Sequence, residues 1–264
     1  MLKTAVKEED KMNREIFKKD NYICFTTDLD WAPEAAIEDA LQLFMRNNIR
    51  PTVFVTHESG VIHRFKDRID LGIHPNFILP SSQGGNMEEI VDYCLKIVPD
   101  AKVFRCHRWY ASNDVYDLMA EKGLCYESNL CAGLDLAQPY IHRSGMASFP
   151  VYFEDGAYIL KRQPLDFKKA KHYFDIPGLK VINIHPMHYA LNTPYFRYTR
   201  EIKDRLSREE WNGMGEDTLK ELSYKGAGIR EFIQELVQYA KSGDRKAVAL
   251  DEAYKMAMKD GIDE

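Results

Sequence analysis

Residues 22–30 (YICFTTDLD), 32–49 (APEAAIEDALQLFMRNNI) and 51–56 (PTVFVT) have the patterns of a strand, a helix and a second strand. The first and third segments are short runs rich in β-branched and aromatic residues, which is typical of buried strands. The middle segment repeats apolar residues at helical spacing, and Pro33 occupies an early position that suits a helix start. Its apolar face comprises Ala36, Ala40, Leu43 and Phe44. This order predicts a parallel βαβ unit.

The same alternation continues along the chain. Further strands are predicted at 70–75, 103–107, 125–129, 149–153, 179–185 and 247–250, and further helices at 61–69, 86–98, 114–122 and 228–240. Seven or eight strand–helix units in 264 residues favour a barrel over an open sheet. We therefore expect a single α/β domain over residues 21–264, folded as a distorted (β/α) barrel with about seven parallel strands.

Two segments stand outside this alternation. Residues 1–20 carry eleven charges, and we expect them to form a charged N-terminal extension. Residues 192–227 are polar and aromatic and too long for an ordinary connection, which predicts a lid or a substrate loop.

The composition excludes several classes of function. The chain has 41 acidic and 36 basic side chains and a formal charge of −5, so it lacks the basic character of a nucleic-acid-binding protein. No stretch approaches 18 consecutive apolar residues, so no membrane span is expected. The five cysteines form no CxxC motif, and the first twenty residues contain no apolar signal core. These features together predict a cytoplasmic protein.

Polar residues gather where the predicted strands end. The first strand ends in Asp28 and Asp30, and the others lead to His74, to Arg105 and His107, to Glu154 and Asp155, and to His185 and His188. In a parallel barrel the carboxyl ends of the strands meet at one face, where active sites form. Residues two apart on a strand point the same way, so we expect Asp28 and Asp30 to share one face, as do Arg105 and His107.

This combination of residue types suits metal-assisted hydrolysis. One aspartate and two histidines form a common open set of ligands for a divalent ion. A second carboxylate can accept a proton from water, and a histidine can protonate a leaving amine, so hydrolysis of an amide or an ester is expected. Each residue also has a structural alternative: Asp30 could cap the helix near Pro33, His74 could sit in a turn, and Arg105 could be a structural ion-pair partner.

Four short motifs resemble those of the polysaccharide deacetylase family, the chitooligosaccharide deacetylase-like carbohydrate esterases. The motifs are TDLDW at 27–31, DLGIH at 70–74, FR at 104–105 and VINIH at 181–185. The resemblance implies that Asp28 is the general base, that Asp30 and His74 are metal ligands, and that His185 is the general acid. It also implies that Arg105 orients a catalytic residue.

The sequence departs from this pattern at one ligand. The family usually has a second metal-binding histidine four residues after the first, where this chain has Ile78. The motifs HPNF at 74–77, PSSQG at 80–84 and RCH at 105–107 resemble instead a divergent branch of the family linked to surface-polysaccharide biosynthesis. That resemblance implies that His107 replaces the missing histidine, with Gln83 as the alternative.

The remaining candidates are expected at the substrate. FED at 153–155 resembles an acidic family motif, and it would bind substrate hydroxyls or support the general acid. The residues expected to contact substrate are Trp31, Asn76, Glu154, Asp155 and His188.

The resemblance therefore implies a metal-dependent hydrolase that removes an N-acetyl or similar acyl group from an amino-sugar or glycan precursor. The cofactor would be a divalent ion, zinc or else nickel, cobalt or manganese. Two alternatives stay open: a metal-free barrel that binds glycans or a partner protein, because fold does not imply function, and a phosphoesterase, which would need more carboxylate ligands or a second metal.

Overall fold

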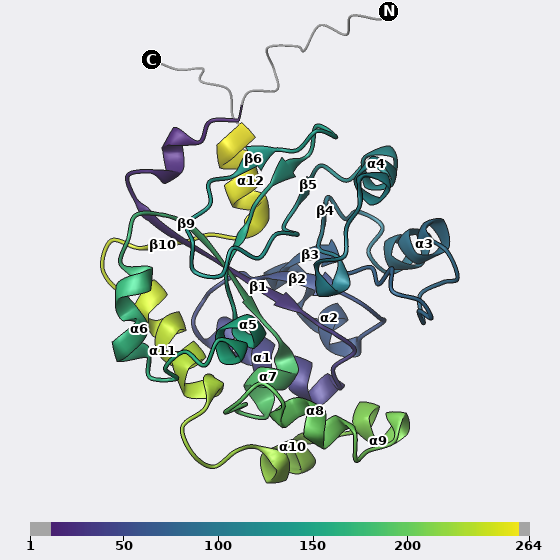
Figure 1. Cartoon of the computed structure of the whole chain (residues 1–264), viewed down its shortest axis with the longest axis vertical. Helices are drawn as coiled ribbons and strands as arrows, with labels where there is room; N and C mark the ends of the chain where they lie inside the picture. Colours follow the sequence, from purple (N-terminus) through teal and green to yellow (C-terminus); the bar gives the residue numbers. More distant parts are fainter. Residues whose placement is uncertain (1–11, 259–264) are drawn as a thin grey trace, which may run out of the picture.

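The computed structural model describes residues 12–258 and shows one curled sheet of ten strands (Figure 1). The spatial order is β6-β7-β5-β4-β3-β2-β1-β9-β8, and β10 pairs with β1 beside this path. The strands are β1 (Asn21–Asp28), β2 (Thr52–Val55), β3 (Asp70–Ile73), β4 (Val103–Phe104), β5 (Tyr126–Glu127), β6 (Tyr140–Ile141), β7 (Ala147–Ser148), β8 (Val151–Glu154), β9 (Gly178–Ile184) and β10 (Lys246–Ala247).

The sheet is almost entirely parallel and nearly closes on itself. Among the described strands, only β6 and β7 pair in antiparallel fashion. The chain after β5 reaches the opposite edge, where Cys131 bridges to Val151 at the start of β8. The expected single α/β domain, a distorted barrel of mainly parallel strands, is thereby confirmed.

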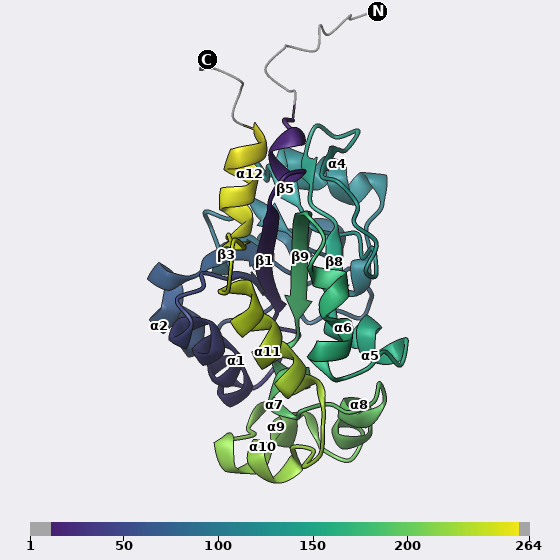
Figure 2. The same cartoon turned by 90° about the vertical axis from the view of Figure 1, so that its left-hand side faces the viewer.

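Helices surround the barrel and cover its two ends (Figure 2). They are α1 (Glu34–Arg46), α2 (Gly60–Phe65), α3 (Met87–Ile97), α4 (Asn113–Glu121), α5 (Asp155–Leu160), α6 (Phe167–Phe174), α7 (Pro186–Ala190), α8 (Tyr198–Lys203), α9 (Arg208–Asn212), α10 (Glu216–Leu222), α11 (Ile229–Ala240) and α12 (Leu250–Met258). As predicted, Pro33 immediately precedes α1, which buries Ala36, Ala40 and Phe44. No helix within residues 12–258 is long and apolar enough to cross a membrane.

The two ends of the barrel differ in chemistry. Tyr22 and Cys24, near the start of β1, belong to an interior apolar cluster that also includes Leu250 of α12. Thr26 and Asp28 follow them on the same face of the strand, so the lining turns polar toward its carboxyl end. Figure 2 shows α12 at the amino ends of the strands and α7 to α10 beyond the carboxyl ends of β1 and β9. The polar end therefore faces the segment 186–222.

The C-terminal segment and residues 192–227 contain helices that were not predicted. The predicted strand 247–250 is shorter, and the helix α12 that follows it was not predicted. Residues 192–227 contain three short helices, α8 to α10, with Trp211 and Leu219 buried, and their role as a lid stays a prediction.

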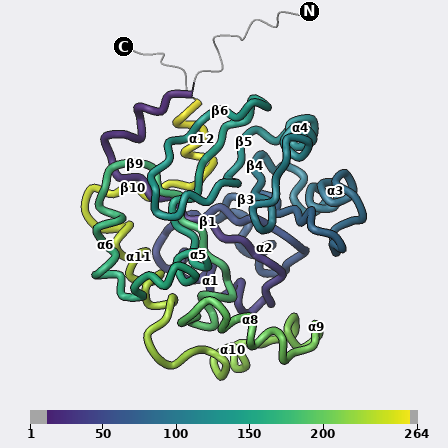
Figure 3. Tube along the Cα trace, viewed as in Figure 1, coloured from purple at the N-terminus to yellow at the C-terminus, as the bar shows by residue number. Residues whose placement is uncertain are grey.

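Residues 1–11 of the predicted extension lie outside the described residues, whereas Phe17 is buried. The backbone amide of Asn13 donates to the carbonyl of Ala257 at 2.8 Å, so the first and last described segments lie together (Figure 3).

We expect the aromatic contacts of α11 to be essential for stability. Phe232 is 1% exposed, and its ring stacks on Phe153 at a centroid distance of 5.5 Å. Phe232→Ala should lower the free energy of unfolding by about 3–5 kcal/mol because it leaves a cavity in a closed core. Phe196→Ala, at a residue that is 49% exposed, is the matched control and should change it by less than about 0.5 kcal/mol. Urea unfolding measures both, and equal effects would contradict the packing described.

Candidate metal centre and catalytic residues

Three predicted metal ligands meet at the carboxyl end of the barrel. Oδ1 of Asp30 lies 3.1 Å from Nε2 of His74 and 2.9 Å from Nδ1 of His107. One ligand atom from each of the three residues lies within 4.8 Å of the other two. The residues follow β1, β3 and β4 of one parallel sheet, and the common direction of these strands brings Asp30 and His107 together although they are 77 positions apart in the sequence.

Turns, and not strand alternation, bring Asp30 and His107 to this point. β1 ends at Asp28, and Asp30 has a φ of 46°. β4 ends at Phe104, and His107 begins a 3-10 turn (His107–Trp109) in which Arg108 has a φ of 55°. The expectation that both residues continue their strands is therefore wrong, although the side chains do converge. Positive φ at non-glycine residues costs about 1–3 kcal/mol and is found at functional sites.

The donor set fits a divalent cation of the zinc type. Burial acts to raise the pKa of Asp30, but hydrogen bonds from His107 and His74 outweigh it and hold the pKa well below its ordinary value. The carboxylate is therefore ionised and can act as a ligand. One carboxylate and two imidazoles that leave further positions open match the ligands of catalytic zinc and related ions.

Gln83 has a different task in this structure. Its side-chain oxygen accepts a hydrogen bond from the amide of Asn76 at 2.6 Å, and its nitrogen donates to the carbonyls of Thr56 and His74 at 3.0 and 3.1 Å. Its polar atoms thus hold the loop that follows His74. These bonds favour His107 over Gln83 as the third ligand.

Asp28 is held by a buried network. Nη1 of Arg105 donates to Oδ1 of Asp28 at 2.8 Å, and the side-chain nitrogen of Asn183 donates to Oδ2 at 2.8 Å. The guanidinium is wholly buried, and its nitrogens also donate to Thr26 and Ser128. Arg105 does not face solvent, so it is a positioning residue for the carboxylate and does not contact substrate.

His185 directly follows β9, which pairs with β1 on the side opposite β2, β3 and β4. Its Nε2 is 3.9 Å from Oδ2 of Asp28 and 3.6 Å from Oδ2 of Asp30. Its Nδ1 lies 2.6 Å from Oδ1 of Asp155, whose Oδ2 accepts a hydrogen bond from the backbone amide of His185. Burial disfavours charge on His185, but the carboxylate of Asp155, reinforced by Glu154, outweighs it and raises the pKa of the imidazole well above its ordinary value.

The residues expected at the substrate divide into two groups. Asp155 is wholly buried and engaged by His185, which favours support of that histidine over contact with substrate. Glu154 accepts hydrogen bonds from Gly156 and Ala157 and lies 3.3 Å from Nδ1 of His185. Trp31 and Asn76, in contrast, line an open cavity beside the ligands.

His188 belongs to a second cluster of potential metal ligands. One ligand atom each of Asp155, His185 and His188 lies within 4.8 Å of the other two. Its Nδ1 lies 3.1 Å from the hydroxyl of Thr193. Because hydrogen bonds from the protein already engage both oxygens of Asp155, this group is better suited to orienting His185 than to holding an ion.

Two members of the network around Asp28 and Arg105 were not predicted from the sequence. Asn183 stands two residues before His185, in an otherwise apolar strand segment, and Thr26 stands two residues before Asp28. The period of two along a strand was the available signal, because it places Asn183 and Thr26 on the faces already assigned to the site.

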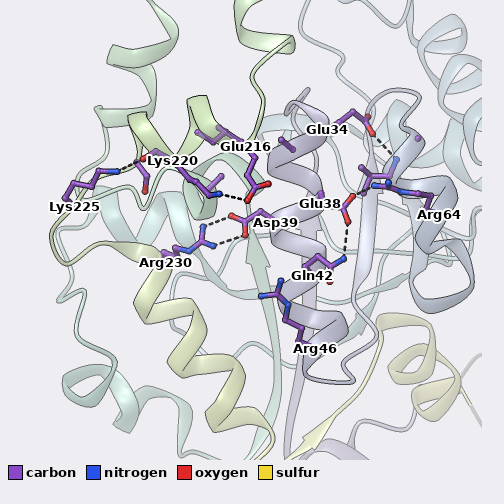
Figure 4. Close-up of a pocket in the computed structure, with 16 residues that line it drawn as sticks. Glu34, Glu38, Asp39, Gln42, Arg46, Arg64, Glu216, Lys220, Lys225 and Arg230 are labelled. Atoms are coloured by element: carbon purple, nitrogen blue, oxygen red, sulfur yellow. Dashed lines mark hydrogen bonds and ion pairs between the residues drawn. The ribbon is translucent and has the colours of Figure 1, made fainter.

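A larger cavity, of about 1040 Å³, lies elsewhere (Figure 4). Six of its charged side chains form ion pairs with one another: Arg230 binds Asp39, Arg64 binds Glu38, and Lys220 binds Glu216. None of the candidate site residues lines it. We therefore assign the chemistry to the carboxyl end of the barrel.

Solved structures show the same fold. A candidate polysaccharide deacetylase involved in O-antigen biosynthesis from Bordetella bronchiseptica is 26% identical, with a TM-score of 0.75 over 86% of this chain and 93% of that one. A candidate polysaccharide deacetylase from Mycobacterium smegmatis is 15% identical, with a TM-score of 0.53 over 90% and 91%.

A third structure shows that this fold serves other chemistry. The 4-α-glucanotransferase from Thermococcus litoralis is 14% identical, with a TM-score of 0.52 over 90% of this chain and 40% of that one. At this identity the likeness shows the fold alone. No curated protein sequence matches the chain. The family model described as WbmS-like polysaccharide deacetylase matches residues 25–202, and the chain therefore belongs to that polysaccharide deacetylase family.

Proposed function

We propose that the protein is a metal-dependent hydrolase that removes an N-acetyl or similar acyl group from an amino sugar during the synthesis of a surface polysaccharide. The observation that carries this proposal is the position of Asp28 and His185. Oδ2 of Asp28 and Oδ2 of Asp30 both lie within 4 Å of Nε2 of His185, so a proton acceptor and a proton donor adjoin the candidate metal ligands.

Asp30, His74 and His107 would hold the ion. A divalent cation there supplies Lewis-acid chemistry: it makes water more acidic and polarises the acyl carbonyl. Asp28 accepts a proton from the attacking water while the new carbon–oxygen bond forms. Arg105 and Asn183 fix both oxygens of that carboxylate, so it need not reorganise as the proton arrives.

His185 completes the reaction at the leaving group. As the carbon–nitrogen bond breaks, its electron pair goes to nitrogen, and Nε2 of His185 donates a proton to that nitrogen. Asp155 binds Nδ1 and so stabilises the protonated imidazole in the orientation that points Nε2 at the site. The products are a free amine on the sugar and a carboxylic acid.

The role of Asp28 can be tested by removing its basicity at constant size. Asp28→Asn also removes the charge that balances the buried Arg105, so the variant should be less stable, and circular dichroism and metal analysis first establish that the assayed protein is folded and metal-loaded. Loss of a general base should lower kcat for an N-acetylated amino sugar by about 10²–10⁴-fold. Asp114→Asn, at an exposed position in the first turn of α4, is the matched control and should leave kcat unchanged. Activity of the metal-loaded Asp28→Asn protein equal to the wild type would refute the role of Asp28.

The metal content separates this proposal from its alternatives. We expect one equivalent of a divalent ion per chain, because within residues 12–258 only the triad Asp30, His74 and His107 has its ligand atoms free to share an ion. His107→Ala should lower the affinity for the ion at least tenfold, whereas His63→Ala, at a side chain that is 68% exposed, should not. Elemental analysis and competitive chelation measure both. A protein without affinity for divalent ions would favour a metal-free binding barrel, and two equivalents would favour a phosphoesterase.

A further inference from the structure

A cavity of about 580 Å³ adjoins the candidate metal ligands, and its charge differs from that of the protein as a whole. Trp31 and Asn76 line one side of it, and in the sequence they follow the candidate ligands Asp30 and His74 by one and two residues. Residues of α8, α9 and the turn between them line the other side. Its volume lies in the range of small-molecule sites, about 300–1,000 Å³. It is therefore large enough for the part of a substrate that extends beyond the reacting amide.

The lining of this cavity is cationic. It contains Arg200, Lys203 and Arg208 and one carboxylate, that of Asp204, although the chain has a formal charge of −5. Asp204 is already paired, because its Oδ1 lies 2.7 Å from Nε of Arg200. Within residues 12–258, no carboxylate lies within ion-pairing distance of Lys203 or Arg208. Among the described residues, Lys203 and Arg208 thus line the cavity as two cations without a carboxylate partner.

Lys203 links this cavity to the metal centre. Its Nζ lies 5.0 Å from the centroid of the Trp211 ring, and Trp211 is 4% exposed, so the lysine rests on a fixed support. Although the residue as a whole is exposed, protein around its ammonium group lowers the pKa of Lys203, and the carboxylate of Asp30 acts on it in the opposite direction. The lysine therefore lies within electrostatic range of a metal ligand.

A bound divalent cation would strengthen the positive field in this region. The charge of Asp30 would then be balanced by the cation that it holds, and it would no longer compensate Lys203. A positive cavity beside a reaction centre attracts a substrate that carries a negative charge and fixes its orientation.

From this arrangement we infer that Lys203 and Arg208 form a subsite for an anionic group of the substrate, a carboxylate or a phosphate several atoms away from the amide that is cleaved. This inference rests on the proposed function, because it assigns the amide to the ligands of the adjoining metal centre. The two oxyanions share the chemistry that the cavity recognises, and they differ in source: a carboxylate belongs to an acidic amino sugar, and a phosphate to a sugar joined to a nucleoside diphosphate or a lipid diphosphate.

The test compares substrates that differ only in charge. The metal-loaded enzyme is assayed with a neutral N-acetylated amino sugar, with the corresponding N-acetylated amino-uronic acid, and with the same sugar joined to a nucleoside diphosphate. Wild type should prefer one of the anionic substrates. Lys203→Gln and Arg208→Gln should each raise KM for that substrate about tenfold with little change in kcat, and leave the neutral substrate within about twofold.

The matched control is Lys220→Gln, because this exposed lysine lies in the neighbouring helix α10 and pairs with Glu216. Lys220→Gln should change neither KM nor kcat for any of the three substrates. A preference for the uronic acid assigns the subsite to a carboxylate, and a preference for the diphosphate assigns it to a phosphate. Equal losses for neutral and anionic substrates in Lys203→Gln, or unchanged KM for all three, would overturn the inference.

Equilibrium binding separates this inference from the proposed function. Calorimetry with glucuronate and with uridine diphosphate as probes should show binding of at least one of them to the metal-loaded wild type, weakened about tenfold in Lys203→Gln. If no amide is cleaved but this weakening is observed, the proposed reaction fails and the anionic subsite stands. If amides are cleaved and anion binding does not depend on Lys203, the subsite fails and the reaction stands.

Discussion

Arg105 imposes a constraint on the whole polar end of the barrel. Its guanidinium is wholly buried, so its charge has to be balanced and its hydrogens have to find acceptors within the protein. The acceptors come from three other segments: Thr26 and Asp28 in β1, Asn183 in β9, and Ser128 after β5. Removing one partner of such a pair costs about 3–5 kcal/mol, because the other charge stays buried alone. The network that places the proposed base is thus also a condition for closing the barrel.

The two ends of the barrel differ in the interactions that hold them together. At the amino end, Tyr22 and Cys24 line an apolar interior that is covered by Leu250 of α12, whose backbone amide donates to the hydroxyl of Thr52. At the carboxyl end, the same face of β1 presents Thr26 and Asp28 to the guanidinium. Thr26, Asp28 and Asn183 lie on strands there. Asp30 and His107, in contrast, lie in the turns just beyond, where a cation can reach them.

The sequence was sufficient for what depends on local periodicity and on parallel topology. Alternating strands and helices predicted the barrel, and the rule that parallel strands end at one face predicted that Asp30, His74 and His107 converge. The turns at Asp30 and Arg108 could not be predicted, because a positive φ at a non-glycine residue is imposed by tertiary contacts. The cationic cavity could not be predicted either, since Trp31 and Lys203 come to line one cavity only after the intervening strands have closed the barrel.

The proposed replacement of the expected second histidine by His107 has a simple geometric explanation. Ile78, at the position where a second histidine would be expected, is 36% exposed, and its backbone amide donates to Asn76. The tight loop around Gln83 directs this stretch away from the ligands. β4 is the next strand in the sheet, and the turn after it brings Nδ1 of His107 to the same oxygen of Asp30 that Nε2 of His74 contacts. A donor from the neighbouring strand can therefore replace one from the loop without moving Asp30 or disturbing the buried network around Arg105.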